Sequence, residues 1–190
     1  MTVAADALWW ARARARGPLR VPAGTGAPEG LTRLVEPGGH DVWILPVPPE
    51  QAGGGAIEEF GLSGTPVEQP NDTARLLAAV VRCCWTDPTA AIWPGADVPW
   101  DAVTSVFRHY ADRDESAFLR AAVAAVRRLH GAGWVLWDER GRRVRLGPRV
   151  AGWSAADLTV LRELYRQMPG PSTDRPTDRP DDRPREGEQG

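Results

Sequence analysis

The sequence predicts a mainly α-helical fold with small β-hairpins, an α+β protein, and three observations predict it. Helix-capping residues and helically spaced apolar residues recur along the chain after residue 71. Two pairs of β-rich runs flank short turns, one rich in glycine and one rich in arginine. Segment 48–70 contains three successive glycines and four prolines, so it has the composition of a linker.

These features divide the 190 residues into four segments. We expect a helix and β-hairpin module over 1–47, a linker over 48–70, a main domain over 71–169 and a disordered tail over 170–190. The apolar composition of 42% is sufficient for a packed core. The tail repeats short Asp-Arg-Pro units without a large apolar side chain, which is typical of disorder.

Two elements are predicted in the N-terminal module. Residues 3–16 have the pattern of a short helix that ends at Gly17-Pro18 and is too short to be stable alone. The β-rich runs 31–36 and 41–47 flank the turn Pro37–His40 and predict a hairpin. An isolated hairpin is marginally stable, so we expect this one to pack on another part of the chain.

The first half of the main domain predicts three helices and a very short strand. They are a helix over 72–85, a strand over 91–93, a helix from Asp97-Val98-Pro99 toward Tyr110, and a helix that ends at Gly131 and Gly133. Asp112 and Glu115 have capping-box spacing, which predicts that they open the third of these helices.

That third helix is strongly amphipathic. One face carries mostly apolar residues: Phe118, Leu119, Ala122, Val123, Val126, Leu129 and His130. The opposite face carries Arg120, Ala124, Arg127 and Arg128. We therefore expect the first face to pack on the core and the second to face solvent.

A second hairpin and a last helix complete the main domain. Residues alternate on both sides of Arg140-Gly141, which predicts a tight turn between two strands. We expect Trp134 and Leu136 to share a face with Val144 and Leu146. The capping spacing of Ser154 and Asp157 opens a helix that ends at Pro169. Its predicted buried residues are Leu158, Leu161, Leu164 and Tyr165.

This order of elements, with the stretch LRAAVAAVRRLHGAGWVLWDERGRRVRLGPRV, resembles bacterial winged helix-turn-helix domains over about residues 71–169. The resemblance implies that the third helix lies in a DNA major groove. It also implies that the Arg140–Arg143 turn reaches phosphates or the minor groove. It places the chain among non-enzymatic DNA-binding proteins, such as transcriptional regulators.

The local charge has two interpretations. Seven arginines lie between residues 127 and 149 against Asp138 and Glu139, which suits phosphate binding. All 23 basic residues are arginine, however, so any soluble domain of this composition would place arginines on its surface. On the DNA interpretation, the binding residues are Arg120, Arg127, Arg128, Arg140, Arg142 and Arg143. Apart from Ser116 near its start, the solvent face of the helix lacks the Asn, Gln, Ser and Thr side chains that read base edges.

The alternative is a winged helix that docks a protein partner, as in accessory subunits of larger complexes, or that associates with itself. Its contact residues would be Trp9, Trp10, Trp137 and Trp153, because exposed tryptophans often anchor interfaces. Trp43, Trp85, Trp100 and Trp134 lie on apolar faces and are predicted core residues. The helix that carries Trp9 and Trp10 either supplies a dimer contact or packs on the first hairpin.

The sequence predicts no catalytic residue, no metal site and no cofactor. The three histidines lack ligand spacing to a cysteine or carboxylate, and no nucleotide-binding or hydrolase motif occurs. Cys83 and Cys84 are adjacent in an apolar helix and are predicted to be packed thiols. No apolar run is long enough to span a membrane, and the cysteine usage favours a reduced, cytoplasmic protein.

Overall fold

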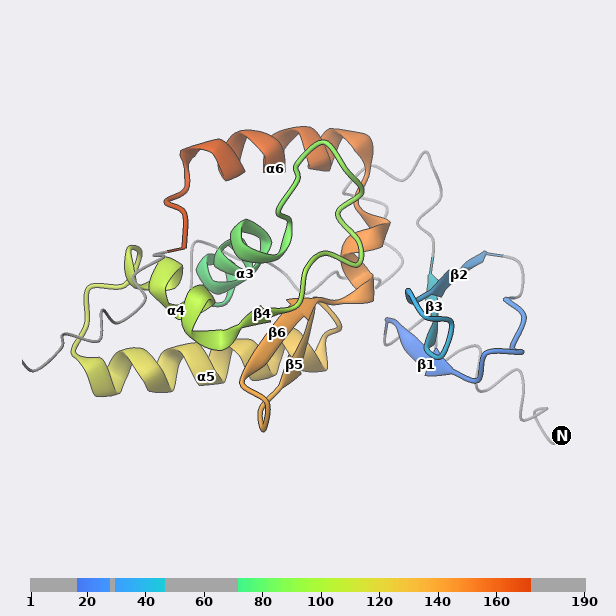
Figure 1. Cartoon of the computed structure of the whole chain (residues 1–190), viewed down its shortest axis with the longest axis horizontal. Coiled ribbons are helices and arrows are strands. Elements are labelled where there is room, and N and C mark those ends of the chain that lie inside the picture. The colour runs from blue at the N-terminus through green and yellow to red at the C-terminus, as the bar shows by residue number, and fades with distance from the viewer. Residues whose placement is uncertain (1–16, 28–29, 47–71, 172–190) are drawn as a thin grey trace, which may run out of the picture.

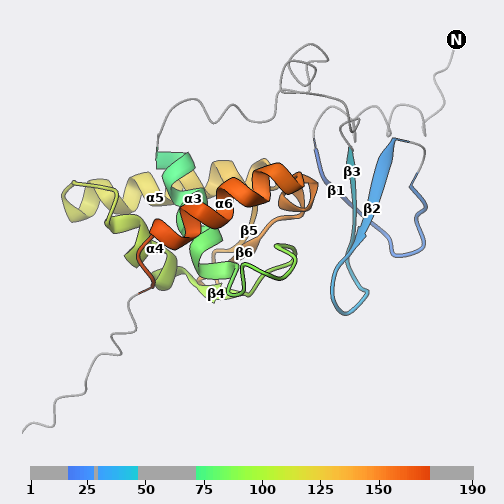
Figure 2. The same ribbon diagram turned by 90° about the horizontal axis from the view of Figure 1, so that it is seen from above.

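The computed structural model describes residues 17–27, 30–46 and 72–171 (Figure 1). Within these residues the fold is mixed α+β, with four α-helices and two antiparallel sheets of three strands each. The predicted N-terminal helix, the predicted linker and the tail beyond Pro171 lie outside the described residues. Seen from two directions, the N-terminal sheet lies at one end of the helical part (Figures 1 and 2).

The N-terminal sheet contains the predicted hairpin and one strand that was not predicted. Strands β2 (Leu31–Val35) and β3 (Val42–Pro46) form the hairpin, and β1 (Leu19–Val21) pairs with the other edge of β3. Gly38 and Gly39 have positive φ values of 101° and 75°, so glycine suits this turn. Central strand β3 buries Val42 and Ile44 completely.

Four helices and a second sheet form the larger part. The helices are α3 (Asp72–Cys84), α4 (Trp100–Arg108), α5 (Glu115–Gly131) and α6 (Ala155–Gln167). Helix α3 packs against α4 and α5, and in Figure 1 it lies between α5 and α6. The sheet has the order β4-β6-β5, from strands β4 (Val98–Pro99), β6 (Arg143–Leu146) and β5 (Val135–Asp138). A 3-10 helix, η1 (Pro148–Gly152), joins β6 to α6.

Two predicted boundaries in the first half of this domain were wrong. Residues 91–93 form no strand, because Pro94 and the positive φ of Gly95, 69°, redirect the chain immediately after them. The short strand is Val98–Pro99, which pairs with β6, so α4 begins only at Trp100. Sequence spacing could not show this pairing, since β6 follows more than forty residues later.

The cap of α5 also differs from the prediction. Asp114, not Asp112, is the N-cap residue, and its carboxylate accepts a hydrogen bond from the Ala117 amide at 2.9 Å. The predicted apolar face is largely correct, with Phe118, Ala122, Val126 and Leu129 buried. Leu119, however, is 44% exposed, because it lies at the edge of that face.

The prediction that Trp134 and Leu136 share a face with Val144 and Leu146 was wrong by one residue. Val135 pairs with Leu146 and Trp137 with Val144, and directly paired residues share a face of the sheet. Val135 and Trp137 therefore face the core, whereas Leu136 lies on the outer face. A shift of one residue exchanges the two faces, and Trp134, just before β5, has the opposite phase to Trp137 within it, so the aromatic residues did not indicate which face is buried.

Helix α6 begins as predicted, with a reciprocal capping box between Ser154 and Asp157. It ends at Gln167. Leu158, Leu161 and Tyr165 pack partly buried against the core, but Leu164 is 41% exposed and was wrongly predicted to be buried. No helix among the described residues is long and apolar enough to cross a membrane.

A close backbone contact joins β6 to the end of α5. A Cβ atom added at Gly147 would overlap the carbonyl oxygen of Gly133, whereas one added at Gly152 would meet nothing within 4 Å. We expect Gly147→Ala to lower the free energy of unfolding by about 2 kcal/mol, because backbone atoms must move apart. Urea denaturation measures this change. The control Gly152→Ala should stay within about 0.5 kcal/mol of wild type, and equal effects would refute the contact.

Candidate nucleic-acid interface

The solvent face of α5 carries two of the predicted DNA-binding arginines. Arg120 and Arg127 are exposed and lie two helical turns apart. The Arg120 guanidinium donates to the Ser116 hydroxyl at 3.3 Å, and that hydroxyl donates to Asp114 at 2.8 Å. Ser116, the one base-reading type of residue predicted here, is therefore already engaged within the helix N-terminus.

The turn between β5 and β6 is held by Asp138. Its carboxylate accepts hydrogen bonds from the backbone amides of Arg140 at 3.1 Å and Gly141 at 3.0 Å. Arg142 has a positive φ of 49°, the left-handed conformation that a tight turn requires. The side chain of Arg140 makes no hydrogen bond or ion pair within the part of the chain that the structure describes. A fixed turn thus presents Arg140 to solvent.

An ion pair brings the helix and this turn together. The Arg127 guanidinium on α5 lies 2.8 Å from the carboxylate of Glu139 in the turn. The face of α5 and the turn are therefore neighbouring parts of one surface, on the side of the molecule away from α6 in Figure 1. We call the exposed arginines of this α5 face, of the turn and of the first residue of β6 the arginine surface. They are Arg120, Arg127, Arg140, Arg142 and Arg143, and Arg143 lies at the border, because it also lines a cleft beside the outer face of β6.

Arg128, predicted to belong to this group, points elsewhere. Its guanidinium donates to the hydroxyl of Thr73 in α3, at 2.9 Å and 3.1 Å. It therefore lies on the flank of α5 that faces α3, apart from the turn.

Carboxylates from an earlier part of the chain pair with the two remaining arginines. Arg142 lies 2.6 Å from Asp101 in the first turn of α4, and Arg143 lies 2.5 Å from Asp97, just before β4. Three of the five arginines of the arginine surface thus have a carboxylate partner. Counting charge along residues 127–149 missed Asp97 and Asp101, because only the β4–β6 pairing brings them here.

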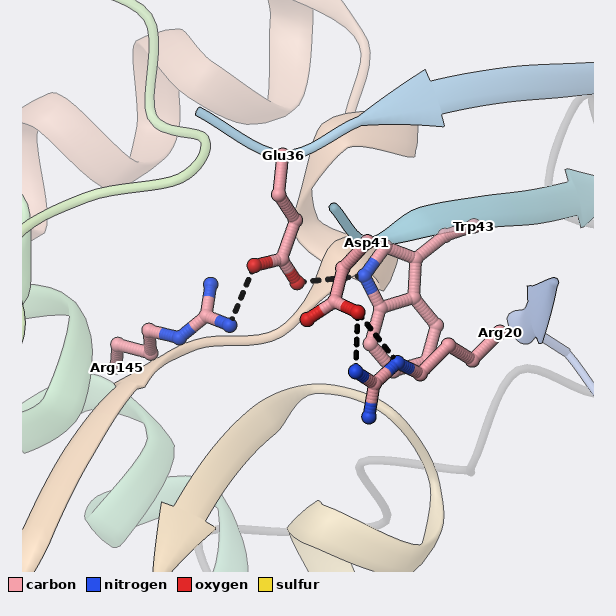
Figure 3. Close-up of polar contacts among 5 residues, drawn as sticks. All are labelled: Arg20, Glu36, Asp41, Trp43 and Arg145. Atoms are coloured by element: carbon pink, nitrogen blue, oxygen red, sulfur yellow. Dashed lines mark hydrogen bonds and ion pairs between the residues drawn. The ribbon is translucent and has the colours of Figure 1, made fainter. Parts of the chain in front are cut away.

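A different arginine of β6 connects the two sheets (Figure 3). The Glu36 carboxylate accepts one hydrogen bond from the Arg145 guanidinium and another from the Trp43 indole N–H, each at 2.7 Å. The Glu36 side chain is only 10% exposed. Nearby, Arg20 donates to Asp41 within the N-terminal sheet. The predicted hairpin therefore does contact another part of the chain: Glu36 binds Arg145 on the outer face of β6, and β3 packs against η1.

An open cleft of about 480 Å³ lies between the two sheets. Its lining comes from both sheets and the end of α5: Arg20, Asp41, Trp43, Asp97, His130, Leu136, Trp137, Asp138, Arg143 and Arg145. Each of its arginines is paired with a carboxylate, so the cleft presents no uncompensated positive charge to a small anion.

The tryptophans predicted as protein-interface residues are half-buried where the structure describes them. Trp137 packs against Trp100, with ring centroids 5.9 Å apart, and its indole N–H is buried. Trp153 stacks on Trp134 at 5.4 Å. Trp9 and Trp10 lie outside the described residues. Of the four predicted core tryptophans, Trp85 and Trp100 are buried and Trp43 and Trp134 are half-buried.

The two cysteines are reduced and buried in α3. Burial raises the pKa of Cys83 to about 11 and also raises the pKa of Cys84, where Cys83 and Asp97 act in the same direction. Both thiols are therefore protonated at neutral pH, which removes the nucleophilic thiolate form. No group of three potential metal ligands occurs in residues 17–27, 30–46 and 72–171.

The chain matches no family model, no curated protein and no solved structure.

The contact made by Glu36 yields a stability prediction. Glu36→Gln keeps the side-chain volume but leaves the partly buried Arg145 without its counter-charge. We expect the free energy of unfolding to fall by about 1–2 kcal/mol. Chemical denaturation followed by tryptophan fluorescence measures it. Asp101→Asn, which removes the same kind of charge from an exposed pair, should cost less than about 0.5 kcal/mol. Equal costs would mean that Glu36 does not hold the two sheets together.

Proposed function

We propose that this chain is a non-enzymatic DNA-binding protein that contacts the phosphates of duplex DNA through the arginine surface. The observation that carries the proposal is the Arg127–Glu139 ion pair, which makes the α5 face and the β5–β6 turn one surface. A helix and a neighbouring basic turn can contact adjacent parts of one duplex. Most hydrogen bonds between proteins and DNA go to phosphate and sugar, so arginines without base-reading neighbours suit this role.

The topology supports a winged-helix interpretation of this surface. The order α3, β4, α4, α5, β5, β6 and the sheet order β4-β6-β5 are those expected of such a domain. In that interpretation α4 and α5 are the helix-turn-helix pair, α5 is the recognition helix and the Glu139–Arg142 turn is the wing.

The electrostatics are compatible with phosphate binding. The arginines of the three ion pairs have side chains between 45% and 65% exposed, and exposed pairs of this kind contribute only about 0–1 kcal/mol. A phosphate can therefore replace a carboxylate partner at small cost. Arg120 and Arg140 need no such exchange, because neither is paired with a carboxylate among the described residues.

A protein-docking role is the second candidate, and one observation favours it. Val160 and Leu164 lie one turn apart on α6 and are 70% and 41% exposed. They are apolar residues on a helix that buries no residue completely. The partner would then contact α6, on the opposite side of α3 from α5, instead of the tryptophans Trp137 and Trp153. Loss of partner or self-association in Val160→Asp, with DNA binding unchanged, would separate the two roles.

We expect salt-dependent binding of random-sequence duplex DNA that weakens in the double variant Arg120→Ala, Arg140→Ala. The magnitude of the slope of log affinity against log salt should fall by roughly 0.9 for each lost phosphate contact, hence by about 1.8. Fluorescence anisotropy over a salt series measures both quantities.

The matched control is Arg166→Ala, which removes an exposed, ion-paired arginine from α6. Its affinity and slope should equal those of wild type. The proposal fails if DNA does not bind at low salt, or if Arg166→Ala weakens binding as much as the double variant does.

A further inference from the structure

Three of the five arginines on the arginine surface form ion pairs with carboxylates. Glu139 comes from the β5–β6 turn, Asp101 from α4 and Asp97 from the residue before β4. Each lies within 2.8 Å of a guanidinium nitrogen. Three separate elements thus supply a negative charge to the same basic surface, and each charge competes with any anion that approaches it.

These three pairs are exposed, which makes them exchangeable. The side chains of Glu139 and Asp101 are 60% and 78% exposed, and Asp97 is half exposed. A released carboxylate at these positions is rehydrated at once, so breaking the pair leaves no buried charge behind.

The ion pair between Arg145 of β6 and Glu36 is a contrasting case, because it is not exchangeable. Glu36 is buried and accepts a second hydrogen bond from Trp43, so releasing Arg145 would strand a charge between the two sheets (Figure 3). The neighbouring residue with the same outward direction on β6, Arg143, has only the exposed Asp97. Burial therefore separates the structural arginine from the exchangeable ones.

We propose that Asp97, Asp101 and Glu139 restrain the DNA affinity of the arginine surface, because phosphates must displace them before the paired arginines can bind. This inference rests on the proposed function. Duplex DNA carries one charge per about 1.7 Å of helix axis, so it presents several phosphates at once and can displace several carboxylates together. The carboxylates hold back weak, single anions and set the salt range in which DNA binds.

The first test is Asp101→Asn, measured by anisotropy with random-sequence duplex DNA at fixed salt. The substitution frees Arg142 and should tighten binding by about twofold to fivefold, the fold-change equivalent of one exposed ion pair. Glu139→Gln frees Arg127 and provides an independent second variant with the same expectation. Both side chains are exposed, and circular dichroism checks that the variants fold.

The matched control is Glu163→Gln, which removes an exposed carboxylate paired with Arg166 on α6. It changes the net charge by the same amount but lies away from the arginine surface, so it should leave affinity unchanged. In an Arg142→Ala background, Asp101→Asn should likewise lose its effect, since no arginine remains to be freed.

The outcomes separate the inference from the proposed function. If wild type binds DNA and neither Asp101→Asn nor Glu139→Gln binds it more tightly, the restraint is refuted and the proposed function stands. A gain that Glu163→Gln matches, or that persists without Arg142, also overturns the restraint, because it would reflect net charge alone. Absence of binding by wild type and all variants overturns both.

Discussion

The structure depends on the alternation of side chains along β6. This strand pairs with both β4 and β5, and it buries Val144 and Leu146 completely. Because neighbouring residues of a strand point to opposite faces, Arg143 and Arg145 must then point outward. The core therefore dictates where these two charged side chains lie, and the ion pairs of Arg143 with Asp97 and of Arg145 with Glu36 follow from that constraint.

The two outward arginines serve different purposes because their partners differ in burial. Arg145 binds Glu36, whose carboxylate also accepts a hydrogen bond from Trp43, so this contact anchors the N-terminal sheet to the outer face of β6. Arg143 meets Asp97 at an exposed position, where water and other anions can compete. The Arg145–Glu36 pair lies between the two sheets and the Arg143–Asp97 pair lies at the surface. One short strand therefore contributes both to the contact between the sheets and to the candidate binding surface.

Sequence reasoning reached the elements that local patterns encode, namely the α5 apolar face, the Ser154 cap and the Pro37–His40 hairpin. It failed where a distant strand decides the local structure. Val98–Pro99 leaves the helix because β6 pairs with it, and β1 joins the first hairpin although only three residues take part. The face of β5 was predicted wrongly, since Trp134 just before the strand and Trp137 within it have opposite phases and are equally bulky.

For the binding surface, residue types were predictable from sequence but partners were not. The turn arginines follow from the hairpin pattern, whereas Asp97 and Asp101 become their neighbours only through tertiary folding. Hydrogen–deuterium exchange of the intact chain, with and without random-sequence duplex DNA, tests the central claim most directly. We expect slower exchange in α5 and in the Glu139–Arg143 turn, with α6 unchanged. Protection confined to α6 or to the N-terminal sheet, or no protection under conditions where DNA is bound, would contradict it.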